Sequence, residues 1–171
     1  MTNRPGDETR VGEACCDTGP VRLYVPATLG DLARPELGPR PACAVTPALR
    51  AALPEEDEEG LELSAFLSAT DLAVLRLADA PGEPRRRVVV ALEVSDVAFA
   101  PVPADLADLA AVVGVVPAVP WACVVSLHLD EPEAADAVAA ALADDDAFDA
   151  LGEIDLLWFD PSERAHLVTG A

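Results

Sequence analysis

Four short apolar runs in this chain are each followed at once by a signal for the start of a helix. The residue at each junction is Thr or Asp, whose side-chain oxygen accepts hydrogen bonds from free N–H groups of a first helical turn. After three of these residues a proline follows within two positions, and proline suits the first helical position. Repetition of strand, cap and helix along one chain predicts a domain in which helices pack on a sheet. The four predicted caps are Thr28, Thr46, Asp130 and Asp160.

Hydrophobic patterning predicts strands at residues 21–25, 42–45, 87–94, 121–129 and 154–159. Apolar residues recur at helical spacing from about residue 56 to residue 78, which predicts one long helix. A shorter helix is expected at residues 104–113. The predicted fold class is therefore α/β (or α+β), with a mixed sheet of about five strands and helices packed on it. The pattern does not define the order of the strands.

The length of 171 residues is that of one ordinary domain, and an apolar content of 51% is typical of globular proteins. Residues 1–20 are polar and carry no apolar stretch, so they predict a disordered N-terminal extension without a signal peptide. Residues 21–171 are then expected to form a single domain.

The chain is strongly acidic, with a formal net charge of −20, and all 11 of its basic residues are arginine. Such a charge repels phosphate backbones, whereas nucleic-acid binding needs clustered cations. The only cluster of cations is Arg85, Arg86 and Arg87, which we interpret as a solvated strand end. Nucleic acid is therefore not an expected partner.

Residues 109–129 contain no Asp, Glu, Lys or Arg and are numerous enough to span a bilayer. Gly114, Pro117 and Pro120 interrupt the segment, and the residues on both flanks are acidic rather than basic. We expect a short helix, a proline-rich turn and a buried strand here, and no membrane partner.

The metal-ligand candidates His128, His166, Cys43 and Cys123 do not show the spacing of a known metal signature. Cys123 and His128 are five residues apart in one predicted strand, so their side chains point to opposite faces. We expect no metal site, no cofactor, and cysteines that serve as small buried hydrophobic residues. An acidic cluster comprises Asp144, Asp145, Asp146 and Asp149. We interpret it as a solvated face and leave open whether it binds a divalent cation weakly.

Nucleophilic catalysis needs a nucleophile, a base and an orienting group. Ser126 and His128 share a strand face but lie roughly 7 Å apart along the chain, which predicts no direct hydrogen bond. Ser162 and His166 could meet on a helix, yet Asp160 and the three residues after it form a capping box that explains this segment. The sequence therefore favours a protein that is not an enzyme.

Binding residues are expected where strands end. None of the four helix starts carries a glycine-rich phosphate loop, and Asp130 and Asp160 place carboxylates where an anion would bind. Aromatic side chains near strand ends are typical of ligand pockets. The predicted ligand-binding residues are Tyr24, Thr28, Trp158 and Asp160.

Residues 22–29, 44–50 and 157–163 resemble segments of an uncharacterised family of small acidic proteins from high-GC Gram-positive bacteria. The resemblance covers most of the chain beyond Pro20. It implies a soluble cytoplasmic protein, and it implies no activity and no site residue.

The leading hypothesis is a non-enzymatic accessory or binding protein with an acidic surface, which recognises a protein partner or a small ligand. The alternative is a small enzyme with a site at the C-terminal strand ends near Thr28, Thr46, Asp130 and Asp160. A concave pocket at that edge, with Arg22, Tyr24 or His128 converging on it, would favour the enzyme. A flat or filled edge would favour the binding protein.

Overall fold

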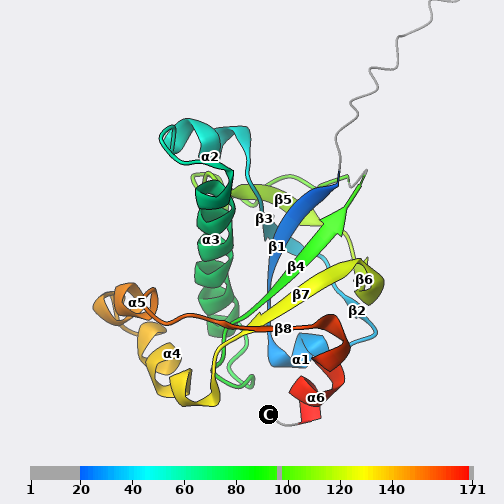
Figure 1. Cartoon of the computed structure of the whole chain (residues 1–171). Coiled ribbons are helices and arrows are strands. Elements are labelled where there is room, and N and C mark those ends of the chain that lie inside the picture. The colour runs from blue at the N-terminus through cyan, green and yellow to red at the C-terminus, as the bar shows by residue number, and fades with distance from the viewer. Residues whose placement is uncertain (1–19, 96–97, 170–171) are drawn as a thin grey trace, which may run out of the picture.

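The computed structural model describes residues 20–95 and 98–169, and its centre is a six-stranded sheet (Figure 1). The strands lie in the order β5-β3-β1-β4-β7-β8, and every pairing among them is antiparallel. A separate two-stranded ribbon pairs β2 (Glu36–Leu37) with β6 (Val119–Pro120). The strands of the main sheet are β1 (Val21–Ala27), β3 (Arg40–Cys43), β4 (Val88–Val94), β5 (Val112–Val116), β7 (Val124–Leu129) and β8 (Leu157–Phe159).

Six α-helices are described, of which one is much longer than the others. Short 3-10 turns precede some of them or stand alone, at Ala104–Leu106, Trp121–Cys123, Pro132–Ala134 and Pro161–Glu163. The helices are α1 (Leu29–Leu32), α2 (Pro47–Ala52), α3 (Glu58–Ala78), α4 (Ala135–Ala141), α5 (Asp145–Leu151) and α6 (Arg164–Thr169). No helix of the described residues is both long enough and apolar enough to cross a membrane.

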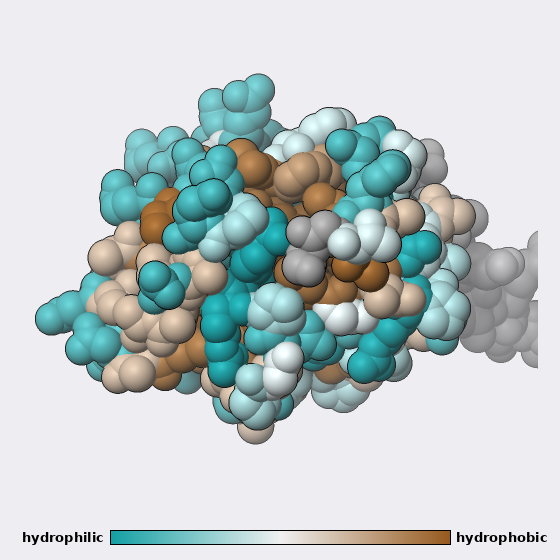
Figure 2. Space-filling model, turned by 90° about the horizontal axis from the view of Figure 1, so that it is seen from below, coloured by the Kyte–Doolittle hydropathy of each residue, from teal (hydrophilic) through white to brown (hydrophobic). Residues whose placement is uncertain are grey.

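The central strands of the sheet are buried on both faces, because their alternate residues pack into two different clusters. Val88 and Val90 of β4 pack on the side of α1 and α6, whereas Val89 and Ala91 pack on the side of α3 (Figure 1). A strand covered on both faces has a nearly continuous apolar sequence, which is the pattern that identified β4. A third, smaller cluster joins the C-terminal half of α3 to α4 and α5. Seen from below, hydrophilic side chains separate the hydrophobic ones at the surface (Figure 2).

Three of the four predicted caps are confirmed. The Thr28 side chain accepts a hydrogen bond from the Asp31 N–H at 3.2 Å, and the Asp31 carboxylate accepts one from the Thr28 N–H at 3.0 Å. Thr46 caps α2 by accepting from the Leu49 N–H at 3.0 Å. Asp160 forms a capping box at the start of the Pro161–Glu163 turn. Local side-chain chemistry alone sets these helix starts.

The prediction that Asp130 is the fourth helix cap is wrong. Its carboxylate is fully buried and is bound by Arg87, which donates to it from Nη2 at 2.7 Å and from its backbone N–H at 2.6 Å. The residue at the cap position is Glu131, whose side chain makes no capping bond. The expectation that the arginines at positions 85–87 form a solvated strand end is therefore wrong for Arg87, which is 2% exposed.

The single α+β domain follows the prediction, whereas one of its elements does not. The expected helix at residues 104–113 is reduced to a 3-10 turn, and β5 begins at Val112 as a sixth strand. Residues at alternate positions of β5, namely Val112, Gly114 and Val116, are buried, which suits a strand. Gly114 has φ +119°, a backbone conformation that residues with a side chain rarely adopt, and the Ala100 carbonyl occupies the place that its Cβ would need. Strand β5 covers the outer edge of β3, so the sheet is one strand wider than predicted.

The sequence suggested a mixed sheet, but all pairings in the main sheet are antiparallel. This pairing separates the four strand ends that were predicted to share one edge. Thr28 and Thr46 leave the β1–β3 pair at opposite ends, because the register places Tyr24 opposite Cys43. Asp130 and Asp160 leave the β7–β8 pair at opposite ends, because Leu129 lies opposite Leu157. The four residues therefore do not form one site.

A buried carboxylate links α1, α3 and β3. Asp31 accepts hydrogen bonds from Arg40 Nη2 at 3.1 Å and from Arg76 Nε at 3.0 Å. Burial alone would raise the pKa of Asp31, but the hydrogen bonds and charges of the two arginines outweigh it and lower this pKa to about 2. Asp31 is thus ionised at neutral pH and holds two cations beside the core.

Replacing Asp31 with Asn is expected to lower the free energy of unfolding by about 3 kcal/mol at pH 7, because Arg40 would remain buried without its carboxylate. Urea denaturation measures the change. The matched control is Asp108→Asn, an exposed acid, which should change stability by less than about 0.5 kcal/mol.

The effect of the Asp31 substitution depends on pH. Since the pKa of Asp31 is lowered from 3.8 to about 2 on folding, its contribution is complete above its unfolded pKa. That contribution is lost as the pH falls from 3.8 through about 2, so the difference in the free energy of unfolding between wild type and Asp31→Asn narrows between these two pH values. A difference that stays constant from neutral pH to about pH 2 would contradict the assignment.

Candidate functional site

A hollow of about 530 Å³ opens on the sheet face beside α3, and we call it the α3 cleft. Helix α3 packs on β1, β3 and β4. One helix is about 10 Å wide, whereas strands are spaced about 4.8 Å apart. A single helix therefore cannot cover six strands, and the face of β7 and β8 beside α3 stays open.

The register of the sheet assembles the floor of the α3 cleft. Tyr24 of β1 lies opposite Ala91 of β4, which lies opposite Ser126 of β7. Two residues further along β7, His128 lies opposite Trp158 of β8. Residues directly opposite each other in an antiparallel pair project to the same face. Four strands thus contribute side chains to one surface.

Helix α3 forms the wall of the cleft with Glu62, Leu63 and Phe66. Glu62 and Phe66 are four residues apart, so they lie on the same face of the helix. The Phe66 ring meets the Tyr24 ring edge-on at 5.6 Å and the His128 ring at 4.8 Å. Aromatic contacts therefore hold α3 in place over β1 and β7.

Ser126 and His128 form a direct hydrogen bond, with 3.0 Å between Oγ and Nε2. The expectation that these residues are too far apart is wrong. It counted only the rise of the backbone, whereas the two side chains lean toward each other along the strand. Burial lowers the pKa of His128 below its ordinary value, so its ring is neutral at pH 7.

Tyr24 donates a hydrogen bond from its hydroxyl to Glu62 Oε2 at 2.5 Å. Burial, together with the hydrogen bond to Glu62, raises the pKa of Tyr24 well above its ordinary value, so the hydroxyl remains a donor. Arg22, on the same face of β1, forms an ion pair with Glu93 of β4. These contacts fix the polar groups at one end of the cleft.

The far rim of the cleft is carried by β8 and the residues before it, namely Asp155, Leu156 and Trp158. Trp158 is 60% exposed, although it is the largest side chain in the cleft. Strand β8 is short and lies at the edge of the sheet. Arg87 anchors the chain that leads into it, by donating to the Leu151 carbonyl at 3.2 Å and to the Ile154 carbonyl at 2.7 Å.

The predicted ligand-binding residues divide into two groups. Tyr24 and Trp158 both line the α3 cleft. Thr28 is buried as the cap of α1, and Asp160 caps the turn after β8, so neither lines this cleft. Glu62 and Phe66 line the cleft but were not predicted as site residues. The available signal was their spacing of four residues in a predicted helix, which places an acidic and an aromatic side chain on the same helix face.

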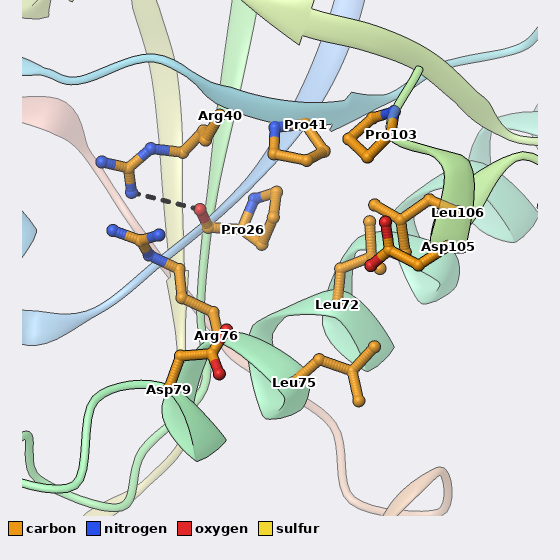
Figure 3. A pocket seen from close by; sticks show the side chains of 10 residues that line it. All are labelled: Pro26, Arg40, Pro41, Leu72, Leu75, Arg76, Asp79, Pro103, Asp105 and Leu106. Carbon is orange, nitrogen blue, oxygen red and sulfur yellow. Dashed lines mark hydrogen bonds between the residues drawn. The ribbon is translucent and has the colours of Figure 1, made fainter.

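A second, smaller hollow of about 200 Å³ lies between the C-terminal half of α3 and the segment around the Ala104–Leu106 turn (Figure 3). Proline and leucine side chains line it, including Pro26, Pro103 and Leu72. The guanidinium groups of Arg40 and Arg76 lie together at one side, where both bind Asp31. Its cations are therefore already paired, and we assign this hollow no ligand chemistry.

The remaining candidates carry less chemistry. No group of three or more His, Cys, Asp or Glu side chains within residues 20–95 and 98–169 is arranged to hold a metal ion. Asp144 of the acidic cluster caps α5 by accepting from the Ala147 N–H at 2.9 Å. Cys43 is fully buried, and burial raises the pKa of its thiol to about 12, which makes it unreactive.

Comparison with known proteins adds a family but no activity. Residues 21–168 match the model of a family described as a family of unknown function (DUF6912). Neither the curated proteins nor the solved structures contain a significant match.

The pKa of His128 is expected to lie below 6.5 and to rise in Phe66→Ala, because removal of the Phe66 ring exposes the imidazole to water. An NMR titration of the two histidine rings measures both values, and the variant His166→Gln assigns the signals. A pKa at or above 6.5 in the wild type would show that the ring is not desolvated.

Proposed function

The chain belongs to this family of unknown function, and from the geometry of the α3 cleft we propose that it is a non-enzymatic binding protein with an acidic surface. The proposed ligand is a small molecule that lies on the sheet face between Phe66 of α3 and Trp158 of β8. The proposal includes the cytoplasmic location that the family resemblance implies, and it includes neither a nucleic-acid partner nor a cofactor.

The exposure of Trp158 is the observation that carries the proposal. An indole that is 60% exposed keeps a large apolar surface in water, although the segment that leads into β8 is held by Arg87. Covering about 100 Å² of that surface with a ligand would contribute about 2.5 kcal/mol. An aromatic face beside polar groups that hydrogen bonds already hold supports binding, because few of these polar side chains would have to be ordered when the ligand arrives.

The size and lining of the cleft also suit a small ligand. Its volume of about 530 Å³ is within the range of small-molecule sites, about 300–1,000 Å³. Apolar groups such as Leu63 and Leu156 alternate with a few polar ones. Ser126 and His128 together offer one hydroxyl and one neutral ring, which can orient a ligand by hydrogen bonding.

A second candidate function, ester or amide hydrolysis, is favoured by the hydrogen bond between Ser126 and His128. Acyl transfer needs a group that orients the base and donors that stabilise an oxyanion. Within the described residues, the His128 ring is hydrogen-bonded to the Ser126 side chain alone, and the β7 backbone is engaged in pairing with β4 and β8. The strand-end site near Thr28, Thr46, Asp130 and Asp160 is not proposed, because antiparallel pairing separates these residues. Arg22, Tyr24 and His128, whose convergence on that edge would have favoured the enzyme, line the α3 cleft on the sheet face instead.

Ligands that bind the wild-type protein are expected to lose binding in Trp158→Ala, because their aromatic platform is removed. The measurement is ligand-observed NMR with a fragment library of mixed charge, followed by calorimetry of the hits. The matched control is Leu109→Ala, which removes an exposed apolar side chain outside the cleft and should leave binding unchanged.

Two results would contradict this proposal. The first is a set of hits whose affinities are the same in the wild type, in Trp158→Ala and in His128→Ala, which would place the binding elsewhere. The second is hydrolysis of p-nitrophenyl acetate that is saturable in the wild type and abolished in Ser126→Ala. That result would establish the hydrolase instead.

A further inference from the structure

We propose that the ligand of the α3 cleft is a small organic cation, namely a protonated amine or guanidinium attached to an aromatic or aliphatic body. This inference rests on the proposed function and adds the chemical class of the ligand. It is carried by the balance of charges in the cleft and by the position of the aromatic side chains.

The carboxylates of the cleft outnumber its cations. Glu62 and Asp155 both line it, and Glu93 lies beside it in the pair with Arg22. Glu62 is oriented by the Tyr24 hydroxyl through Oε2, while its Oε1 makes no hydrogen bond within the described residues. Asp155 is exposed, and its carboxylate makes no hydrogen bond within the described residues. Neither carboxylate forms an ion pair within the described residues, because the attraction between Glu62 and Arg22 acts at longer range.

The only cation that lines the cleft is already neutralised. Arg22 pairs with Glu93 across the β1–β4 register, and this pair offsets the positive charge that an incoming anion would meet. The ring of His128 is neutral at pH 7 because of its burial. An anionic ligand would thus meet two carboxylates and one cation that is already paired, whereas a cationic ligand would find charge-assisted hydrogen-bond acceptors.

Aromatic rings add a second contribution that favours a cation. The exposed face of Trp158 lies on the same side of the sheet as Tyr24 and Phe66. A cation held over the face of a tryptophan is attracted by the negative face of its ring system. The apolar surfaces of Leu63 and Leu156 are available to the uncharged body of the ligand.

The charge of the whole protein acts in the same direction. A net charge of −20 raises the local concentration of cations around the molecule and repels anions. This long-range attraction is not specific, so it speeds encounter without fixing a site. Specificity comes from the short-range arrangement of Glu62, Asp155 and Trp158.

The inference can be tested with three probes that share an indole ring and differ in charge: tryptamine, indole-3-ethanol and indole-3-propionate. At low ionic strength, calorimetry should show tryptamine binding at least about tenfold more tightly than indole-3-ethanol, with indole-3-propionate the weakest. The preference should decrease as salt is added, because screening weakens the interaction with the carboxylates.

Substitutions assign this preference to the cleft. Glu62→Gln and Asp155→Asn should each reduce the tryptamine preference by about threefold to tenfold while leaving the binding of indole-3-ethanol nearly unchanged. The matched control is Glu133→Gln, which removes an exposed acid that does not line the cleft and keeps the preference. Thermal unfolding of each variant confirms that the fold is intact.

The outcomes distinguish this inference from the proposed function. If all three probes bind alike and all lose binding in Trp158→Ala, the cleft is a binding site but its ligand is not selected as a cation. If indole-3-propionate binds most tightly, or if tryptamine fails to bind while other fragments do, the inference is wrong. If no fragment of any charge binds at millimolar concentration, the inference and the proposed function are both wrong.

Discussion

The ion pair between Arg87 and Asp130 is the interaction on which the arrangement of the second half of the chain depends. Both side chains are almost completely buried. Arg87 binds the Asp130 carboxylate from the start of β4, and its remaining donors reach the carbonyls of Leu151 and Ile154. One guanidinium thus joins β4, the end of β7, the end of α5 and the segment before β8. Loss of either partner would leave an uncompensated buried charge, which is among the most destabilising changes a fold can suffer.

The α3 cleft also depends on Arg87, because this residue holds the chain that leads into β8. Helix α3 packs mainly on β1, β3 and β4 and touches β7 through Phe66, whereas α4 and α5 pack against its C-terminal half. Arg87 holds the chain after α5 so that β8 pairs with β7 and presents Trp158 opposite His128. The open sheet face is therefore bounded on one side by a helix and on the other by an anchored edge strand. The guanidinium that binds Asp130 thus also holds the segment that leads into the rim of the proposed binding site.

Local signals in the sequence predicted most of the elements, whereas interactions between distant segments were beyond it. Helix α3 and the caps at Thr28 and Thr46 depend on residues within one or two turns, and all three were predicted. Asp130 resembles a cap in sequence, yet its partner Arg87 lies 43 residues earlier, and only the fold brings the two together. The binding residues divide similarly: Tyr24 and Trp158 stood out as aromatic residues near strand ends, whereas Glu62 joins them only through the packing of α3 on β1.

The most direct test of the α3 cleft as a binding site uses the only two tryptophans of the chain. Trp158 is exposed in the cleft, whereas the Trp121 indole donates to the Arg34 carbonyl at 2.8 Å and is covered by the Arg164 guanidinium. Their two indole N–H signals can be followed in ¹⁵N-labelled protein as tryptamine is added. Our account predicts that the Trp158 signal shifts saturably while the Trp121 signal stays in place. Equal shifts of both signals, or a shift of Trp121 alone, would contradict it.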